Sequence, residues 1–291
     1  MNRAMRSISV KALGFVFAFL LLSLPVAAQK DSKPAAGPLM TRTTTRHETY
    51  RLQFGGTVTL SAAPAGSIII EGWQRNEVDV SASIELQAPS AADLDRLAAV
   101  NTFVVDADTD HIRIMTSGTH DRAFMKRIAK NFPKSLIGLP WKIDYRIKIP
   151  ALTDLEVDAG NGPVSLSGFE GMLRLNALNS DANLSLTGGL VSILIQSGTI
   201  NLTIPARSWH GLGSEIKLAS GNLNLDLMPG FSADINAEVL RLGEIKNSFS
   251  ELQPGEGNSI TPRSVRARAG SGGATLTFTV GDGTITIRQK Q

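Results

Sequence analysis

One phrase of alternating apolar and polar residues returns four times between Leu155 and Leu227. Each copy is an apolar–polar–apolar strand, a turn of the Ser/Asn-Gly type and a second strand of the same pattern. The copies begin at Leu155, Leu173, Ile193 and Ile216. A repeat of roughly 20 residues lies at the short end of the range found in solenoid proteins.

A copy with a single apolar face cannot bury that face alone, so stacking neighbouring copies joins the faces into one core. The pattern therefore predicts an all-β fold with a parallel β-solenoid-like repeat domain over residues 151–291. An antiparallel β-sandwich remains the alternative, because two-residue glycine turns are equally common in hairpins. The side chains expected to point inward are Leu155, Val157, Val164, Leu166, Leu173, Leu175, Leu184, Leu186, Ile193, Ile195, Ile200, Leu202, Ile216, Leu218, Leu223 and Leu225.

The turns of the repeat carry glycine at Gly162, Gly198 and Gly221. Glycine suits a turn because positive φ costs it little. In the second copy we assign this place to Asp181, a residue that tolerates the left-handed conformation at a higher cost. The outward positions hold mostly Ser, Asn and Thr, as is typical of a solvated sheet face.

The chain before the repeats predicts an N-terminal β module over residues 48–150. Period-two strands alternate there with short turns, and residues 91–100 form one helical stretch with Leu94 and Leu97 on a shared face. Residues 29–47 show no periodicity and are expected to be a flexible leader. Residues 247–262 are polar and aperiodic, which predicts a loop.

Residues 121–132 predict a short amphipathic helix inserted into this module. Phe124, Ile128 and Phe132 follow one another at intervals of four, which places them on one face. Asp121 is the expected N-cap, and Pro133 ends the helix.

The opposite face of this helix is basic and allows two interpretations. A short amphipathic capping helix would seal the open end of the solenoid with its apolar face, which we favour because exposed solenoid ends need a cap. Alternatively, its cations contact an anionic surface such as lipid head groups or acidic glycan. The residues expected to make that contact are Arg122, Lys126, Arg127, Lys130 and Lys134.

Residues 1–28 have the pattern of a cleaved secretory signal peptide. Three basic residues precede the apolar run 12–24, and small residues precede Gln29. The run is shorter than the roughly 20 residues needed to span a bilayer. We therefore expect an exported protein, located in the periplasm, outside the cell or at the cell surface.

Charge and cysteine content exclude several classes of protein. The chain has 29 Lys+Arg and 26 Asp+Glu. Without the predicted signal the two numbers are equal, so net charge gives no reason to expect a nucleic-acid partner. Cysteine is absent, which excludes disulfides, thiolate metal sites and a cysteine nucleophile.

Catalytic and cofactor motifs are missing from the sequence. There is no HxH, HExxH, Gly-x-Ser-x-Gly or phosphate-loop pattern, so we expect no metal, no cofactor and no enzymatic activity. The four histidines are expected to be surface residues: His47, His111, His120 and His210.

A carbohydrate-active β-solenoid enzyme is the second hypothesis. Such enzymes use two carboxylates held about 5–10 Å apart. The acids of the repeats fall in different columns, which gives no sign of a pair. They are Glu156, Asp158, Asp181, Asp226 and Asp234.

Several short phrases resemble one bacterial family. Gly66-Ser-Ile-Ile-Ile-Glu-Gly-Trp73, then Asn76–Val80, are similar to the N-terminal signature of the DUF4097 family, also named the putative-adhesin or β-strand-repeat family. Ile143–Pro150 leading into Asp158–Gly162 resembles its middle, and Gly283–Ile287 its end. The resemblance covers most of the chain after residue 28. It implies a parallel β-solenoid-like fold and an envelope setting, and it supplies no catalytic residues. The basic insertion and the loop before Pro262 depart from the family.

The sequence thus predicts an exported, non-enzymatic β-repeat protein that acts as an adhesin-like binding or scaffolding module at the bacterial cell envelope. Its expected partner is a protein or glycan of the envelope and not a nucleic acid. A peripheral membrane-surface protein that binds anionic lipid through the basic helix is a further alternative.

Overall fold

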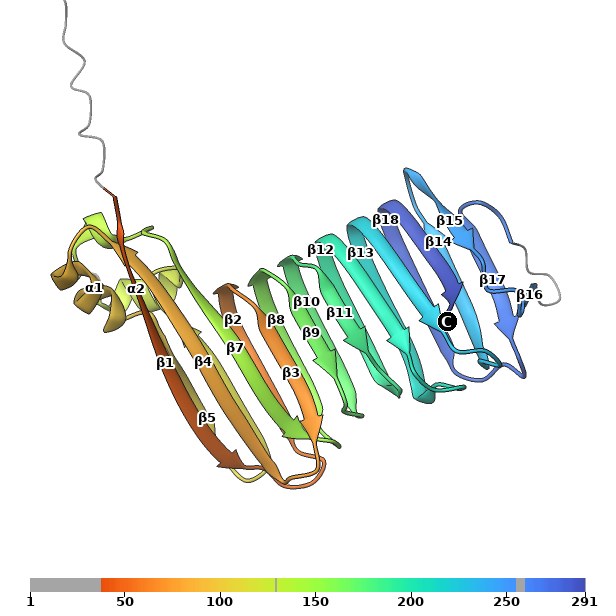
Figure 1. Cartoon of the computed structure of the whole chain (residues 1–291), viewed down its shortest axis with the longest axis horizontal. Coiled ribbons are helices and arrows are strands. Elements are labelled where there is room, and N and C mark those ends of the chain that lie inside the picture. Colours follow the sequence, from red (N-terminus) through yellow and green to blue (C-terminus); the bar gives the residue numbers. More distant parts are fainter. Residues whose placement is uncertain (1–37, 129, 255–259, 291) are drawn as a thin grey trace, which may run out of the picture. The chain divides into compact units, whose positions relative to one another are not determined.

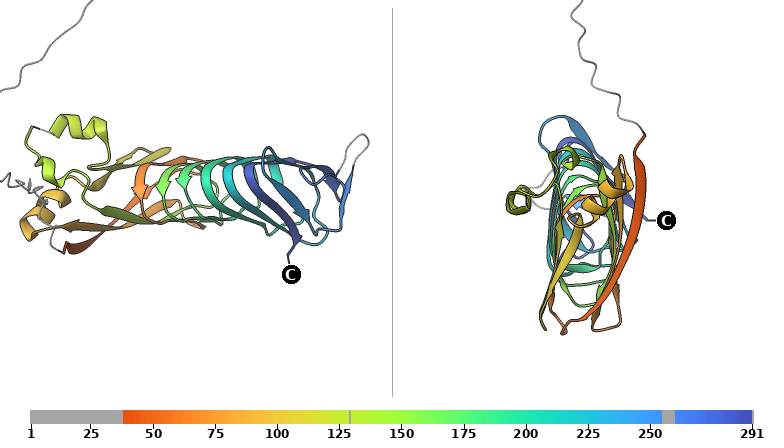
Figure 2. Two further views of the ribbon diagram at one scale, coloured as in Figure 1. Left: turned by 90° about the horizontal axis from the view of Figure 1, so that it is seen from above. Right: turned by 90° about the vertical axis from the view of Figure 1, so that its left-hand side faces the viewer.

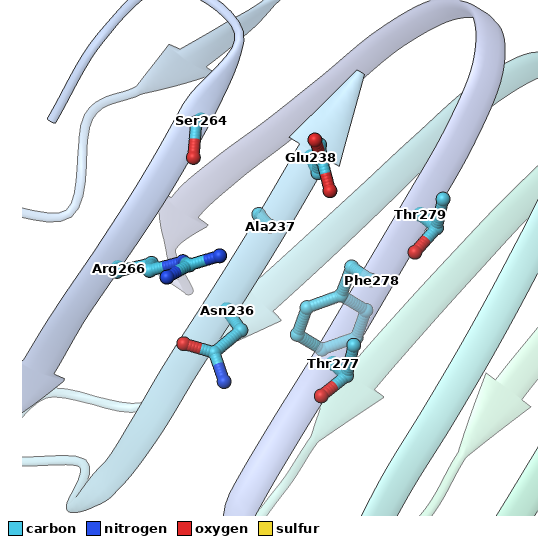
Figure 3. Close-up of a pocket in the computed structure, with 8 residues that line it drawn as sticks. All are labelled: Asn236, Ala237, Glu238, Ser264, Arg266, Thr277, Phe278 and Thr279. Atoms are coloured by element: carbon cyan, nitrogen blue, oxygen red, sulfur yellow. The ribbon is translucent and has the colours of Figure 1, made fainter. Parts of the chain in front are cut away.

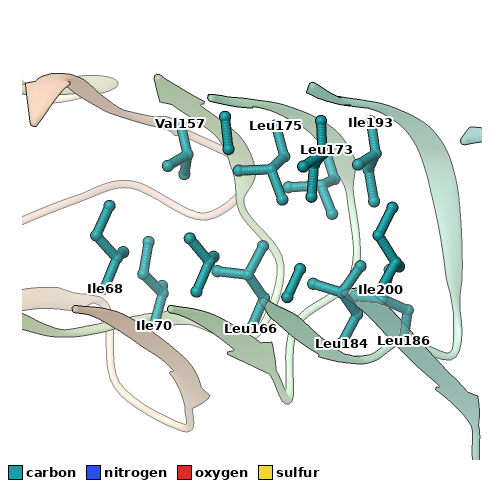
Figure 4. Packing of buried hydrophobic residues seen from close by; sticks show 14 of the residues in the cluster. Ile68, Ile70, Val157, Leu166, Leu173, Leu175, Leu184, Leu186, Ile193 and Ile200 are labelled. Atoms are coloured by element: carbon teal, nitrogen blue, oxygen red, sulfur yellow. The ribbon is translucent and has the colours of Figure 1, made fainter. Parts of the chain in front are cut away.

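The computed structural model describes residues 38–128, 130–254 and 260–290. Within these residues the strands form one hydrogen-bonded sheet of 18 strands (Figure 1). The sheet bends at its corners into two facing walls, and apolar side chains from both walls fill the space between them (Figure 4). Successive repeats pair in parallel register. The predicted parallel β-solenoid-like fold is confirmed, and the antiparallel sandwich is wrong.

Among the described residues, the first half of the chain contains seven strands and three short helices. They are β1 (Met40–Arg51), β2 (Thr57–Ala65), β3 (Ile68–Trp73), β4 (Glu77–Ala88), α1 (Ala91–Ala98), β5 (Thr102–Ala107), β6 (His111–Ser117), α2 (Arg122–Ile128), the 3-10 helix η1 (Lys134–Leu136) and β7 (Trp141–Pro150).

The second half is composed of strands in the described residues. They are β8 (Asp154–Asn161), β9 (Val164–Ser167), β10 (Met172–Asn179), β11 (Ala182–Ser185), β12 (Gly188–Ile204), β13 (His210–Leu227), β14 (Ala233–Val239), β15 (Gly243–Asn247), β16 (Leu252–Pro254), β17 (Ser264–Ala269) and β18 (Thr275–Gln289).

Two walls follow from the strand pairings. Wall A runs in the order β5, β6, β2, β8, β10, β12, β13, β18, β14, β17 and β16. Wall B runs in the order β1, β4, β7, β3, β9, β11, β12, β13, β18 and β15. The long strands β12, β13 and β18 contribute one half to each wall.

The order of strands in the walls departs from chain order at both ends. The last strand, β18, lies between β13 and β14 and pairs in parallel with both (Figure 1). The early pair β2 and β3 likewise lies between β6–β7 and β8–β9. The predicted module 48–150 and repeat domain 151–291 therefore share continuous hydrogen bonding across residue 150.

The core agrees with the predicted alternation. Each of the 16 side chains expected to point inward is at most 2% exposed. Burial of apolar surface stabilises the folded state by about 25 cal/mol for each Å². These stacked aliphatic side chains are therefore the main source of stability. Phe231, Phe249 and Phe278, which lie outside the four copies, extend the same core and are fully buried.

The register between copies corrects one prediction. Leu155 pairs with Leu173, and Leu173 with Val191, so the first steps are 18 residues long. Gly198 lies against Ser180, whose carbonyl oxygen would be 2.1 Å from an added Cβ. The glycine position of the second copy is thus occupied by Ser180. The assignment to Asp181 is wrong, because alternation alone does not fix the length of a turn.

The predicted flexible leader, residues 29–47, is wrong for the part that the structure describes. Met40–Arg51 forms the edge strand β1, which pairs antiparallel with β4 along its whole length. Its inward positions carry polar residues such as Arg46 and Glu48 in place of apolar ones, and this hid the strand from a pattern based on hydrophobicity.

Polar side chains of β1 cover the N-terminal end of the core. The guanidinium of Arg46 lies 4.2 Å from the ring centre of Phe103 and donates to the Phe103 carbonyl at 2.7 Å. Arg46 and Tyr50 both donate to the carboxylate of Glu48. We call Arg46, Glu48 and Tyr50 the end plug. Because Arg46 belongs to wall B and Phe103 to wall A, the end plug ties the walls together.

Of the two α-helices, α1 contributes residues to the core cluster at this end, as does Leu136 of η1. Its Leu94 and Leu97 are 2% and 0% exposed and belong to the core cluster. Ser90 caps it by accepting a hydrogen bond from the backbone N–H of Asp93. The capping role that we expected of residues 121–132 therefore falls mainly to α1, while Phe132 is the residue of the predicted helix that packs against the core.

No helix in the described part of the chain is long and apolar enough to cross a membrane. The predicted signal peptide, residues 1–28, lies outside the described residues.

Candidate functional site

The predicted basic segment projects from the outer side of wall A. Seen from the end, α2 stands outside the wall opposite β1 (Figure 2). Asp121 caps it by accepting hydrogen bonds from the backbone N–H groups of Ala123 at 2.8 Å and Phe124 at 3.1 Å, as predicted. The hydrogen bond from Phe124, then that from Ala123, lowers the pKa of Asp121. The helix ends at Ile128, one turn earlier than predicted.

All five cations expected to contact an anionic surface are exposed. We call Arg122, Lys126, Arg127, Lys130 and Lys134 the basic segment. Among the described residues none of them forms an ion pair. Elsewhere cations often have an acidic partner: Arg42 with Asp95, Arg113 with Asp106, Lys142 with Asp144, Lys217 with Glu215, Arg241 with Asp282, Arg268 with Asp234 and Arg288 with Asp226.

The apolar side of the segment anchors it only partly. Met125 is 7% exposed, while Phe124 and Ile128 are half-buried. Ile137, just after η1, is 45% exposed. Phe132 packs against the core cluster and Leu136 of η1 belongs to it. The segment is thus held by Met125, Phe132 and Leu136, and it presents both cations and some apolar surface to solvent.

A second feature of wall A was missed in the sequence. Its outer face carries four exposed apolar side chains on β10 and β12, which we call the apolar row: Met172, Leu178, Leu190 and Leu194, exposed by 39%, 47%, 47% and 49%. Met172 and Leu190 are direct neighbours across the strand pair.

Two hollows lie along the apolar row, and one of them extends to His120, which precedes the basic segment. One, of about 530 Å³, is lined by Leu178, Leu194 and His120. The other, of about 380 Å³, is lined by Met172, Leu190 and Leu194. Leu194 belongs to both hollows, and His120 directly precedes the cap of α2. The row therefore extends to the residue that precedes the cap of α2.

One sequence signal could have revealed the row. Leu194 stands in an outward column with Asp158, Asn176, Lys217 and Thr279. An apolar residue in an otherwise polar outward column is unusual for a solvated face. The inward alternation around Ile193 and Ile195 hid it, because Leu194 extends the apolar run.

The outward asparagines of wall B bond to one another. Asn201 donates from Nδ2 to Oδ1 of Asn183 at 3.0 Å, and Asn224 donates to Asn201 at 2.8 Å. Such a ladder uses part of each amide's bonding capacity within the fold. The polar face of the repeats is thus in part a structural element.

The acids named in the sequence occupy separate environments. Asp226 pairs with Arg288 and Asp234 with Arg268. Asp181 accepts from the backbone N–H of Thr199 at 2.9 Å. Asp158 accepts from Asn176 at 2.8 Å and is the single carboxylate lining the larger hollow.

A third hollow of about 420 Å³ lies on wall A between β14, β17 and β18 (Figure 3). Phe278 lies beneath it, and the only ionisable side chains in its lining are Glu238 and Arg266. A mechanism with two carboxylates requires a second acid that none of these three hollows provides.

The histidines lie in four different places. His47 contacts Asp79 at 2.8 Å, His111 contacts Thr59 at 2.9 Å, and His210 lies 3.5 Å from Glu170. The ring of His120 lies 5.3 Å from that of Trp141. Within the described residues no three His, Asp or Glu side chains are grouped as they would be around a metal ion.

Comparisons with known proteins found structural similarity only. No family model matches the chain, so its similarity to the DUF4097 family stays a prediction. No curated protein matches it. Among solved structures, a putative cell adhesion protein from Clostridium sporogenes aligns with a TM-score of 0.45 and 12% identity, over 85% of this chain and 100% of that one. A putative adhesin from Bacteroides fragilis aligns with a TM-score of 0.27 and 12% identity, over 84% and 97% of the two chains.

Proposed function

We propose that this chain is an exported, non-enzymatic β-repeat protein that acts as a binding or scaffolding module at the bacterial cell envelope. The supporting observation is the distribution of bonding capacity over its surface. In the repeats, many polar and charged side chains bond to one another, in ion pairs and in the asparagine ladder. Exposed cations and apolar side chains instead gather on the outer side of wall A.

The chemistry of the hollows supports a binding role over catalysis. Each lining contains at most one acid that is not already in an ion pair, and general acid–base cleavage of a glycan requires two carboxylates in defined roles. The pKa shifts also have structural causes. Burial raises the pKa of Tyr145, whose hydroxyl bonds to Thr116 inside the core.

The envelope setting is supported by the secretory pattern of residues 1–28 and by the β-strand-repeat phrases. A stack of rigid rungs holds side chains at fixed spacings, which suits a scaffold that presents a contact surface.

Incubating the chain without residues 1–28 with purified peptidoglycan and acidic envelope polysaccharide tests the non-enzymatic part. We expect no release of reducing ends above the buffer control, because none of the three hollows described above is lined by two carboxylates. Steady release that scales with protein concentration would contradict the proposal.

A further inference from the structure

We infer that the basic segment and the apolar row together form one docking surface for an anionic lipid bilayer. The inference rests on the proposed envelope function and specifies its partner.

The two groups of side chains lie on the same side of the molecule. The larger hollow brings His120, at the start of the insertion, against Leu178 and Leu194 of the row. From there α2 projects away from wall A (Figure 2). A flat partner that meets the outer face of wall A would therefore also meet the insertion.

Charge complementarity identifies the partner. Five exposed cations occur within residues 122–134, with no ion-pair partner among the described residues. An anionic leaflet supplies negative charge at any position along such a segment, whereas a protein partner must place individual carboxylates. Clustered Lys and Arg beside an apolar surface are the usual signature of contact with anionic head groups.

The apolar row suits the acyl boundary of the same surface. Its members are flexible aliphatic side chains, and Leu212, which is 78% exposed, directly precedes Gly213, the register partner of Leu190. Soluble monomers seldom gather apolar side chains in this way without a binding role. The two acids that line these hollows are engaged: Asp158 accepts from Asn176, and Glu215 lies 2.6 Å from Lys217.

Flotation with lipid vesicles tests the inference on the chain without residues 1–28. We expect it to bind vesicles that contain phosphatidylglycerol and not vesicles of pure phosphatidylcholine, and we expect binding to weaken with added salt. Each cation at an anionic surface contributes roughly fivefold to affinity, so Lys126→Glu combined with Lys130→Glu should reduce binding at least about thirtyfold.

A matched pair controls for net charge. Lys246→Glu combined with Lys290→Glu changes the net charge by the same amount. Lys246 is an exposed residue of β15, the last strand of wall B, and Lys290 is an exposed residue that follows β18, so both lie outside the basic segment. We expect this variant to retain nearly all binding. Equal losses in the two charge variants would overturn the inference, because they would indicate attraction by net charge alone.

A second pair tests the apolar row. Leu190→Ser with Leu194→Ser should reduce vesicle binding about tenfold, since it removes apolar surface from the contact. Leu240→Ser with Leu242→Ser, at side chains 54% and 71% exposed between β14 and β15, should not. All four leucines are exposed, so the variants should fold.

Two further results would overturn the inference. One is equal binding to neutral and anionic vesicles, or no binding to either. The other is a dimer in sedimentation equilibrium that Leu190→Ser with Leu194→Ser dissociates, since the row would then face a second copy. Neither result involves glycan cleavage, so failure of the lipid inference is distinguishable from failure of the proposed function.

Discussion

Glycine at the corners of the repeats is required by the backbone of the neighbouring strand. At Gly221, φ is +137° and an added Cβ would lie 1.8 Å from the carbonyl oxygen of Gly198. Both the conformation and the space exclude a side chain. The corner glycines therefore set how closely successive repeats stack.

Replacing Gly221 tests this directly. Gly221→Ala should lower the free energy of unfolding by at least about 2 kcal/mol, because strain and backbone displacement add. Gly230→Ala is the matched control: its φ is +73° but nothing lies within 4 Å of the added Cβ, so only about 1 kcal/mol of strain is expected. The measurement is urea unfolding. Equal losses would show that space at the corner is not limiting.

The end plug makes stability depend on pH. The hydrogen bond from Tyr50, followed by contacts with Arg46, holds the pKa of Glu48 below its ordinary value of 4.5, although burial opposes this. A lowered pKa favours the folded state above the ordinary pKa, and this contribution is lost as pH falls through the lowered value. Burial, with Glu48, raises the pKa of Tyr50 to about 12, so its contribution is lost as pH rises toward that value.

Two variants check the end plug. The free energy of unfolding should fall less between about pH 5 and pH 3 in Glu48→Gln than in the unsubstituted protein, because the variant lacks the Glu48 carboxylate whose protonation destabilises the fold. Tyr50→Phe should raise the pKa of Glu48. Carbon-13 NMR of the Glu48 carboxyl group as a function of pH measures this pKa. A pKa that does not move in Tyr50→Phe would mean that the Tyr50 hydroxyl has no influence on it.

Among the elements, the two helices of the N-terminal half have different roles. The sequence showed two amphipathic segments of similar quality, at residues 91–100 and 121–132. Periodicity identifies an apolar face but not the surface against which it packs. α1 follows β4 directly and packs on the end of the core, whereas α2 is tied down mainly through Met125.

This difference predicts unequal effects of substitution. Leu97→Ala should cost about 3 kcal/mol of unfolding free energy, because a fully buried side chain leaves a cavity. Phe124→Ala, at a half-buried position of α2, should cost less than about 1.5 kcal/mol. Thermal and urea unfolding of both variants give the comparison. A larger loss for Phe124→Ala would assign the capping role to α2.

How much of each element could be predicted depends on where its pattern comes from. Leu173, Leu184 and Ile200 are inward residues that alternation identifies correctly. Strand β1 was missed because polar end-plug residues occupy its inward side. The apolar row was missed because Leu194 stands between two inward isoleucines.

At the scale of the whole molecule, the walls depart from chain order at both ends. β18 lies between β13 and β14, and β2–β3 lie inside β6–β7. Alternation predicts which face of a strand is buried but carries no information on which strand is its neighbour. Antiparallel strands then finish the walls, with β1 and β4 at one end and β17 and β16 at the other.

The central claim is that the protein binds the envelope and does not cleave it. The most direct measurement is sedimentation of the chain lacking residues 1–28 with isolated bacterial envelopes, with soluble sugars measured in the same supernatant. We expect saturable binding without release of sugar fragments. Absence of binding, or release of fragments that increases with time, would contradict the claim.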